Sequence, residues 1–330
     1  MRLFRHTADI PADALGAVVA IGNFDGVHRG HQAVIGAACG LAQASGVPLA
    51  VMTFEPYPRE VFNPLGEPFR LTPLRIKARL IEALGVDFLY VQHFDRDFAN
   101  LSPQQFVSDI LVAGLGASHV VVGYDFQFGS KRQGDVALLQ KMGAERGFAV
   151  TSVQPVTGEG GLYSSTAVRA ALSSGRPAEA AAILGHWWEL EARVEHGQAK
   201  GGKIGYPTAN LKLTGILSPA PGVYAVRAGI DMGDATHWHK GVANFGKRPT
   251  IASDGELVFE VHLFDYQEDL YGRHLRVRLI DYLRPEMRFA DIDALKAQIA
   301  QDAQAARQIL ANIPDMPPRP TTSPSPKVGP

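Results

Sequence analysis

Short apolar runs alternate with helix-like periodicity over the first half of the chain. The apolar runs are short enough for buried strands and cover residues 17–21, 48–54, 88–92, 119–122 and 148–153. Between them, apolar residues recur every three or four positions, which predicts helices at 32–44, 74–84, 103–111 and 136–145. Two more helices are predicted at 165–172 and 178–184. Strands and helices that alternate in this way predict a parallel sheet with helices on both faces.

The second half has a different pattern, in which apolar and polar residues often alternate. The predicted strands are 189–194, 223–227, 240–243, 257–264 and 275–283, with turns rich in Gly and Pro. They predict an antiparallel barrel or sandwich, followed by one long helix over about 291–310. Residues 314–330 are rich in Pro, Ser and Thr, so we expect a disordered tail. The change of pattern predicts two domains, 1–186 and 187–313.

The composition is that of a globular protein and excludes some classes of protein, but it indicates no particular function. The chain has 330 residues, 46% of them hydrophobic and 20% charged, as in ordinary globular proteins. A formal net charge of −1 gives no electrostatic case for nucleic acid, and no apolar run is long enough to span a membrane. The single cysteine, Cys39, excludes an intrachain disulfide framework and is expected in the core. With no secretion signal at the N-terminus, a cytoplasmic protein is expected.

The most informative stretch lies between the first predicted strand and the first predicted helix. It reads Gly-Asn-Phe-Asp-Gly-Val-His-Arg-Gly-His over residues 22–31. A helix N-terminus presents N–H groups and a positive dipole end, which is where α/β domains bind phosphate. His28 and His31 can therefore face the same phosphate oxygen. The spacing fits no dinucleotide fingerprint, P-loop or zinc-protease helix, and the two histidines alone would equally fit a plain surface turn.

Two more turns and one helix start belong with this stretch. Turns rich in Pro or Gly follow the strands 48–54 and 119–122, and the carboxyl ends of parallel strands meet at one edge of a sheet. We therefore expect the three turns to converge. Ser164, Ser165 and Thr166 precede an alanine-rich helix, which is typical of an N-cap. The alternative is a second phosphate site, in which Arg169 neutralises the charge.

Together the motifs resemble two known enzyme modules. Residues 22–31, Thr53-Phe54-Glu55-Pro56, the turn 123–129 and Ser164-Ser165-Thr166-x-x-Arg169 resemble the FMN adenylyltransferase module. The motifs Gly-Tyr-Pro-Thr-Ala-Asn at 205–210, Pro-Gly-Val-Tyr at 221–224 and the stretch 241–250 resemble the riboflavin kinase module. Their order is that of the bacterial bifunctional riboflavin kinase/FAD synthetase family, and the resemblance spans roughly residues 15–310.

The resemblance implies a fold and two consecutive reactions. The fold is a Rossmann-like nucleotidyltransferase domain followed by an antiparallel six-stranded barrel with a long C-terminal helix. The barrel would phosphorylate riboflavin to FMN with ATP, and the first domain would transfer an adenylyl group from ATP to FMN, giving FAD and pyrophosphate. The implied partners are these small molecules, with Mg²⁺ as cofactor and without nucleic acid or a membrane.

In the first module the resemblance implies an ATP site and catalytic roles for His28 and His31. Its residues are Gly22, Asn23, Phe24, His28, His31, Asp125, Ser165, Thr166 and Arg169. Catalysis there would be positioning and charge stabilisation, because no protein nucleophile is needed. Three aromatic residues, Phe54, Phe126 and Phe128, are candidates to flank the flavin, with burial in the core as the more common alternative.

In the second module the resemblance implies a magnesium–ATP site and a general base. The side-chain oxygens of Thr208 and Asn210 are hard ligands of the kind that Mg²⁺ prefers. The implied ATP-binding residues are Gly205, Pro207, Thr208 and Asn210, and a glycine-rich stretch at 197–205 would close over the phosphates. Glu260 would accept the proton of the riboflavin 5′-hydroxyl. Arg284 and Glu286 would line the flavin site.

The chain departs from the family pattern at a few positions. The family usually has His where this chain has Tyr57, a basic residue where it has Gln127, and an arginine pattern where it has Lys203. These changes bear on rates and affinities. Two alternatives stay open at this point: a nucleotidyltransferase fused to a barrel that only binds, and a flavin or nucleotide sensor without activity. The intact motif 207–210 and Glu260 argue against both.

Overall fold

The computed structural model describes residues 1–195, 206–250 and 253–314. The predicted tail from residue 315, Gly205 and the glycine-rich stretch before it lie outside these ranges. The described residues form two compact units. Unit 1 comprises Met1–Glu67 and Pro73–Ser164, and unit 2 comprises Pro68–Thr72 with the described residues from Ser165 onward. None of the helices in the described part of the chain is long and apolar enough to cross a membrane.

Unit 1 is built on a six-stranded parallel sheet with the strand order β1-β4-β3-β2-β5-β6. The strands are β1 (Arg2–Phe4), β2 (Val18–Ile21), β3 (Leu49–Glu55), β4 (Phe88–His93), β5 (His119–Gly123) and β6 (Ala149–Val153). The parallel sheet predicted from the apolar runs is thereby confirmed. β1 was not predicted because three half-exposed residues carry no periodic pattern, and only its pairing with β4 defines it as a strand.

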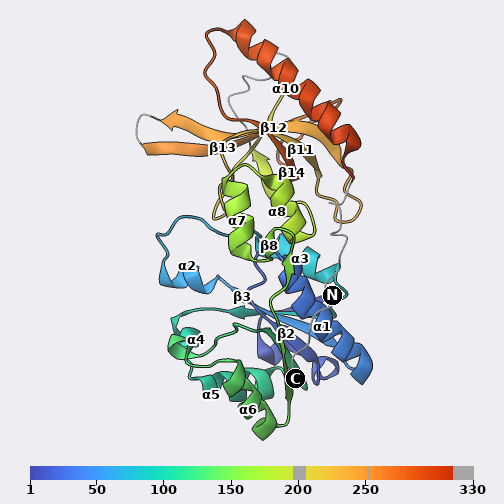
Figure 1. Cartoon of the computed structure of the whole chain (residues 1–330), viewed down its shortest axis with the longest axis vertical. Coiled ribbons are helices and arrows are strands. Elements are labelled where there is room, and N and C mark those ends of the chain that lie inside the picture. The colour runs from blue at the N-terminus through green and yellow to red at the C-terminus, as the bar shows by residue number, and fades with distance from the viewer. Residues whose placement is uncertain (196–205, 251–252, 315–330) are drawn as a thin grey trace. The chain divides into compact units, whose positions relative to one another are not determined.

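The helices of unit 1 cover both faces of this sheet (Figure 1). They are α1 (Arg29–Ser45), α2 (Pro58–Phe62), α3 (Leu74–Glu82), α4 (Arg96–Ala99), α5 (Pro103–Gln105) and α6 (Val136–Arg146). The predicted helix 103–111 begins at Pro103 behind a capping box made by Ser102, and it continues as a π-helix over Phe106–Gly114. Short 3-10 turns occur at Thr7–Asp9, Ala12–Ala14 and Ser130–Arg132, and a small hairpin joins β7 (Thr157–Gly158) to β8 (Gly161–Leu162).

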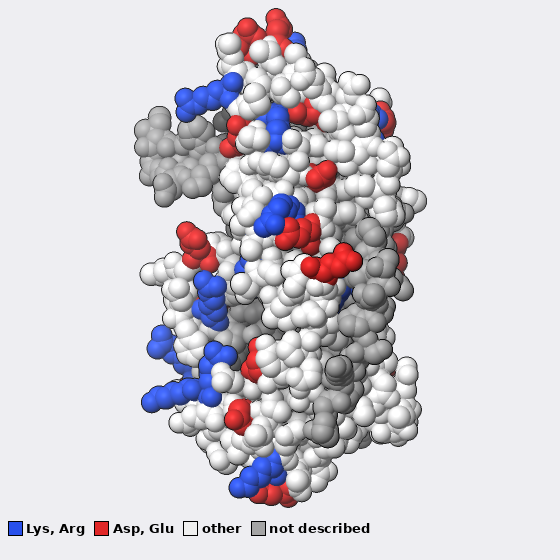
Figure 2. All heavy atoms as spheres, viewed as in Figure 1, with Lys and Arg blue, Asp and Glu red and all other residues white. Residues whose placement is uncertain are grey.

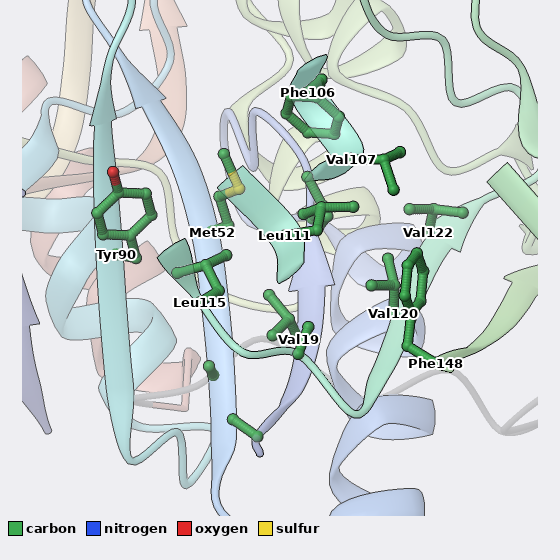
Figure 3. Close-up of a cluster of buried hydrophobic side chains, with 14 of the residues drawn as sticks. Val19, Met52, Tyr90, Phe106, Val107, Leu111, Leu115, Val120, Val122 and Phe148 are labelled. Atoms are coloured by element: carbon green, nitrogen blue, oxygen red, sulfur yellow. The ribbon is translucent and has the colours of Figure 1, made fainter. Parts of the chain in front are cut away.

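Alternate residues of the central strand point into two different cores. Val18 and Ala20 of β2 pack with the apolar side chains of α1 and α3, whereas Val19 and Ile21 pack against the π-helix and α6. Figure 3 shows this second core, with Phe106, Val107 and Leu111 among its labelled side chains. Burial on both faces explains why the strands read as continuous apolar runs in the sequence.

Unit 2 contains a closed barrel of six antiparallel strands with the order β10-β13-β12-β11-β14-β9. The strands are β9 (Glu189–Glu195), β10 (Ala209–Leu211), β11 (Gly222–Ile230), β12 (His239–Thr250), β13 (Ser253–Leu263) and β14 (His274–Arg284). The barrel is confirmed, and a strand that the pattern did not predict, β10, begins within the motif at 205–210. Pairing with β9 and β13 extends this segment, whose three residues are too few for a periodic signal.

The described residues of unit 2 also form the helices α7 (Ser165–Ser173), α8 (Pro177–Leu184) and α10 (Ile292–Asn312). Helix α10 begins after Asp291, whose carboxylate accepts the N–H of Ala294, and it lies along the outside of the barrel (Figure 1). Ala306 and Leu310 of α10 pack with Val242, Phe264 and Ile280 of the barrel. The outer face of these strands is therefore apolar under α10, while other parts of the barrel surface stay polar.

Candidate active sites

The carboxyl edge of the parallel sheet gathers the three predicted turns. β3, β2 and β5 are neighbours in the sheet, and the turns after all three emerge at the same edge. The chain passes from β2 to β3 on one side, while β5 lies on the other side of β2. Such a reversal of strand order opens a crevice outside the carboxyl ends, where open α/β sheets bind ligands. The predicted convergence of the turns is confirmed.

The turn after β2 holds several residues in left-handed backbone conformations. Phe24, Gly26 and Val27 have φ angles of 49°, 85° and 43°. For the two non-glycine residues this conformation costs of order 1–3 kcal/mol each, so the surroundings must fix it. Phe24 is buried and packs edge-on against the His31 ring, with 5.2 Å between ring centroids. It supports the turn from the core side.

His28 and His31 lie together at the start of α1. The Nδ1 atom of His28 accepts the backbone N–H of His31 at 3.3 Å, which caps the helix. The two rings stack, with centroids 3.6 Å apart and planes inclined by 23°. A neutral imidazole that accepts at Nδ1 carries its proton on Nε2, so Nε2 of His28 can donate to an anion. The two rings therefore lie together, and that they face one phosphate oxygen stays a prediction.

The surroundings of Gly30 leave no room for a side chain. A Cβ atom on this residue would lie 3.0 Å from Cε1 of His28 and 3.0 Å from the carbonyl oxygen of Tyr163. Any side chain would push the His28 ring or this backbone away. Tyr163 immediately precedes Ser164 and the first residues of α7, so the chain leads from this contact into the predicted second phosphate site.

Three buried polar residues beside the turn were not predicted as site residues. The Oγ1 atom of Thr53 donates to the carbonyl oxygen of Asn23 at 3.1 Å, and the Tyr57 hydroxyl donates to Oδ1 of Asp25 at 3.0 Å. The fully buried ammonium of Lys77 lies next to both Thr53 and Tyr57. A sequence signal existed for Lys77, because it occupies a core-facing position three residues after Leu74 in an otherwise amphipathic helix.

The turn after β5 carries Asp125 and two aromatic candidates. Asp125 is exposed, and its Oδ1 lies near Gly123 at the carboxyl end of the strand. Phe128 and Phe54 are buried in the core, whereas Phe126 is half-buried and stacks on Phe128 with 5.7 Å between centroids. Of the two interpretations left open, the core therefore accounts for Phe54 and Phe128.

Ser165, Thr166 and Arg169 open helix α7, which belongs to unit 2. Nε of Arg169 donates to the carbonyl oxygen of Phe69 at 2.8 Å, and its guanidinium lies over the Phe69 ring. That these residues share one ATP with His28 and His31 stays a prediction.

In unit 2, four polar side chains form a row across adjacent strands of the barrel. Asn210 of β10 pairs in register with Glu195 of β9 and with Glu260 of β13, and Glu260 pairs with Asn244 of β12. Directly paired residues in antiparallel strands point to the same face. The residues beside them in sequence, such as Ala209 and Phe259, are buried, so the row lies on the outer face of the barrel. The sequence prediction did not include Asn244.

A pocket of about 220 Å³ is lined by Ala209 and Val261, the sequence neighbours of Asn210 and Glu260, which face away from the row. Thr208 and Pro207 form one wall, Val261 and Leu263 of β13 the floor, and the segment from Tyr266 to Tyr271 the opposite side. The carbonyl oxygen of Pro207 lies 2.8 Å from Nδ1 of His262, which fixes the approach to β10. The lining is mainly apolar with a few oxygens, as in sites for aromatic ring systems.

Arg284 is the last residue of β14, and Glu286 lies two residues after it. The Arg284 guanidinium forms hydrogen bonds with both carboxylate oxygens of Asp302 in α10, at 2.8–3.1 Å. Oε1 of Glu286 is within 3.5 Å of Nδ2 of Asn244, at the end of the polar row. Glu286 is exposed and Arg284 half-buried, so their side chains meet different neighbours.

The donor set of the row suits a hard cation held together with phosphate. Asn210 and Glu260 pair in register and face the same side of the barrel wall, and Thr208 lies two residues before Asn210, just outside β10. No cluster of three His, Cys, Asp or Glu residues suited to a metal ion occurs in the described part of the chain. Mg²⁺ needs no such cluster, because it usually keeps waters and shares phosphate oxygens. The residues present therefore fit Mg²⁺ with a nucleotide.

Charges of both signs occur on the face drawn in Figure 2, with several Lys and Arg side chains at the left edge of its lower half. A mixed surface agrees with the formal net charge of −1. A broad basic face of the kind that binds nucleic acid is not visible in this view.

Comparison with known proteins gives two consecutive family matches. The FAD synthetase family matches residues 10–167, and the riboflavin kinase family matches residues 184–310. The bifunctional riboflavin kinase/FMN adenylyltransferase of Escherichia coli K12 is 47% identical over 94% of this chain and 98% of its own. The protein of the same name from Bacillus subtilis is 37% identical over 90% of this chain and 93% of its own.

The solved structure of a macrolide-efflux protein from Streptococcus pneumoniae has the same fold. Its TM-score is 0.82 at 32% identity, over 94% of this chain and 99% of its own. The relatives match 90–94% of the chain, and the two family modules follow one another in the predicted order, which supports a bifunctional enzyme over a barrel that only binds or a sensor without activity. The chain belongs to the family of bifunctional riboflavin kinases/FMN adenylyltransferases, which convert riboflavin to FMN and FMN to FAD with ATP.

Proposed function

We propose that the two reactions use two separate sites, one in each unit. Adenylyl transfer to FMN takes place at the carboxyl edge of the parallel sheet, around His28 and His31. Phosphorylation of riboflavin takes place on the polar row of the barrel, around Thr208, Asn210 and Glu260. The observation that carries this assignment is the register of the barrel, which places the predicted base Glu260 directly beside Asn210.

In the adenylyltransferase site, the residues act by holding ATP in place and stabilising charge. His28 and His31 donate to the phosphates, and the N–H groups at the start of α1 point the same way. The phosphate of FMN attacks the α-phosphorus of ATP, and pyrophosphate leaves. Gly22, Asn23 and the backbone of Phe24 line the turn, and Asp125 at the neighbouring strand end orients the nucleotide. This arrangement supplies the positioning that phosphoryl-type transfers require.

The start of α7 contributes to the same ATP in this proposal. Ser165 and Thr166 offer hydroxyls and helix N-terminal N–H groups, and Arg169 offers a guanidinium. The resemblance of Ser164-Ser165-Thr166-x-x-Arg169 to the family motif supports this part of the proposal.

In the kinase site, Glu260 accepts the proton of the riboflavin 5′-hydroxyl while that oxygen attacks the γ-phosphorus of ATP and ADP leaves. Thr208 and Asn210 would hold Mg²⁺, which would neutralise charge on the ATP phosphates. The pocket beside Pro207 and Thr208 receives a ring of the nucleotide. Arg284 and Glu286 border the flavin side, where Glu286 reaches Asn244.

The first prediction separates the two sites with one variant each. Glu260→Gln keeps size but removes the base, so riboflavin phosphorylation should fall about 10²- to 10⁴-fold while FMN adenylylation persists. His28→Ala should lower FMN adenylylation by about 10²- to 10³-fold while riboflavin phosphorylation persists. The measurement is chromatographic separation of flavins after incubation with ATP, Mg²⁺ and either riboflavin or FMN.

Two exposed positions supply the controls. Glu145→Gln on α6 and His237→Ala, an exposed histidine between β11 and β12, make the same chemical changes away from both sites. Neither should alter a rate. Loss of both reactions in either test variant would contradict the two-site assignment, and unchanged rates would remove that residue from it.

A further inference from the structure

Lys77 of α3 is buried completely, in contact with groups that border the adenylyltransferase turn. Its Nζ atom lies 3.0 Å from Oε1 of Glu55 and 3.3 Å from Oγ1 of Thr53. The same ammonium lies over the Tyr57 ring, 4.2 Å from the centroid. All three neighbours come from the carboxyl end of β3 and the turn after it. Lys77 thus ties helix α3 to the edge of the sheet where the site lies.

Two of these neighbours pass the contact on to the turn that carries His28 and His31. Thr53, itself fully buried, accepts from Lys77 and donates to the backbone carbonyl of Asn23. The Tyr57 hydroxyl donates to the carboxylate of Asp25, and both side chains are at least 97% buried. The ammonium therefore supports the turn at two points: at the backbone of Asn23 through Thr53, and at the side chain of Asp25 through Tyr57.

The turn needs such support because of its backbone. Phe24, Gly26 and Val27 lie in the left-handed region, and the two supported residues, Asn23 and Asp25, alternate with them. Conformations of this kind persist only where neighbouring groups fix them. A shift of the turn would move His28, because the turn leads directly into the cap of α1.

Core packing alone does not explain a charge at this position. Burying an ammonium is unfavourable unless it is paired, and an apolar side chain of similar volume often packs at least as well. Here the ammonium meets a carboxylate, a hydroxyl and an aromatic face at once. Two of these groups, Thr53 and Tyr57, are bonded in turn to the residues of the turn before α1.

We propose that Lys77 is a positioning residue for adenylyl transfer: through Thr53 and Tyr57 it holds the turn that places His28 and His31 on the ATP phosphates. The proposal rests on the assignment of these histidines made above. It predicts that removing the ammonium slows the adenylyl-transfer step while substrates still bind and the barrel still phosphorylates riboflavin.

The test variant is Lys77→Met in the full-length protein, with Lys141→Met, an exposed lysine of α6, as the matched control. For FMN adenylylation, Lys77→Met should lower kcat about 10- to 100-fold with little change in KM for ATP, because misplaced groups act mainly on the transition state. Circular dichroism and the melting curve of the same sample report on the folded fraction, and riboflavin phosphorylation in unit 2 should be unchanged. Lys141→Met should leave both reactions unchanged.

A double-mutant cycle separates positioning from a general loss of stability. Thr53→Val removes the hydroxyl between Lys77 and Asn23 while keeping the shape, and Tyr57→Phe removes only the bond to Asp25. Each should lower kcat for adenylylation, and the effects of Thr53→Val and Lys77→Met should not add, because they break the same chain of contacts. If Lys77→Met does not fold, the kcat values of Thr53→Val and Tyr57→Phe decide the question.

The outcomes are distinct. Unchanged kcat in folded Lys77→Met, equal loss of both reactions, or unchanged kcat in both Thr53→Val and Tyr57→Phe would each overturn the proposal. The His28→Ala variant is measured alongside. If His28→Ala does not slow adenylylation, the site assignment itself is wrong, whereas slow His28→Ala with normal Lys77→Met refutes the role of Lys77 alone.

Discussion

Gly246 illustrates how a single missing side chain shapes the kinase site. A Cβ atom at this position of β12 would lie 1.8 Å from Oε1 of Glu286. The glycine therefore lets the Glu286 carboxylate lie against the strand, where it reaches Asn244 in the polar row. The sequence marks this glycine only as part of a family motif, while the reason for it lies in a residue forty positions away.

The substitution Gly246→Ala should therefore affect binding more than stability. Glu286 is exposed and flexible, so it can swing away at small cost, and the melting temperature should change little. With the carboxylate displaced, KM for riboflavin should rise several-fold while FMN adenylylation is unaffected. Steady-state kinetics of both reactions check this. Gly36→Ala in α1, where a Cβ meets nothing within 4 Å, is the control, and an unchanged KM in Gly246→Ala would contradict the role of Glu286.

At the same scale, the sequence predicted His28, His31 and Glu260 but missed Asn244, Thr53 and Lys77. The first group lies in motifs whose spacing is local, so a short stretch of chain identifies it. The second group acquires its place only when separate strands and helices meet. Their residue types, an amide, a hydroxyl and an amine, have many ordinary uses in a chain of this composition.

Among the elements, α10 depends on one ion pair as well as on its apolar face. Asp302 of α10 is buried and accepts both arms of the Arg284 guanidinium, and Nε2 of Gln298 adds a third donor. Arg284 also ends β14, so the pair joins the helix to the strand that borders the polar row. Such a bidentate pair fixes direction as well as distance.

Replacing Asp302 with Asn should destabilise unit 2. It leaves the half-buried Arg284 without a carboxylate, which costs about 2–4 kcal/mol for a pair at this degree of burial. Urea unfolding followed by barrel tryptophan fluorescence measures the effect. The control is the exposed ion pair between Arg307 of α10 and Asp265, which lies outside the helix. Asp265→Asn should change the free energy of unfolding little, because exposed ion pairs contribute little to stability. Equal effects of the two variants would contradict this ranking.

The ends of a helix were predictable to within a few residues where the apolar residues recur regularly over several turns. α1, α3 and α6 agree closely with their predicted ranges, because one apolar face over three turns is a clear pattern. The winding of Phe106–Gly114 as a π-helix and the strand character of Ala209–Leu211 were not predictable. Both depend on partners elsewhere in the fold and not on local preference.

At the scale of the whole molecule, α7 and α8 raise the question of where one domain ends. The sequence predicts a domain boundary near residue 186. In the structure, however, both helices belong to the same compact unit as the barrel. Ala181 of α8 packs in the cluster with Ala225 and Ile280, and the carbonyl oxygen of Leu172 accepts the N–H of Ala220. The two divisions make different predictions for fragments of the chain.

A fragment over 165–314 should be more stable than one over 187–314. The longer fragment keeps the apolar cover that α7 and α8 provide, so its melting temperature should be higher by roughly 5–10 °C, or about 2–3 kcal/mol. Circular dichroism measures the melting curves, and riboflavin phosphorylation checks that each fragment is native. Equal melting temperatures would instead favour the boundary at residue 186.

The sequence by itself determined the two fold classes, the order of the modules and the turn with His28 and His31, because each follows from a periodic or contiguous pattern. The tertiary structure decided what surrounds them: the strand order that gathers three turns at one edge, the register that pairs Asn210, Glu260 and Asn244, and the buried contacts of Lys77. These features join residues far apart in the chain. Their energies arise only when burial brings the groups into contact, so no local pattern records them.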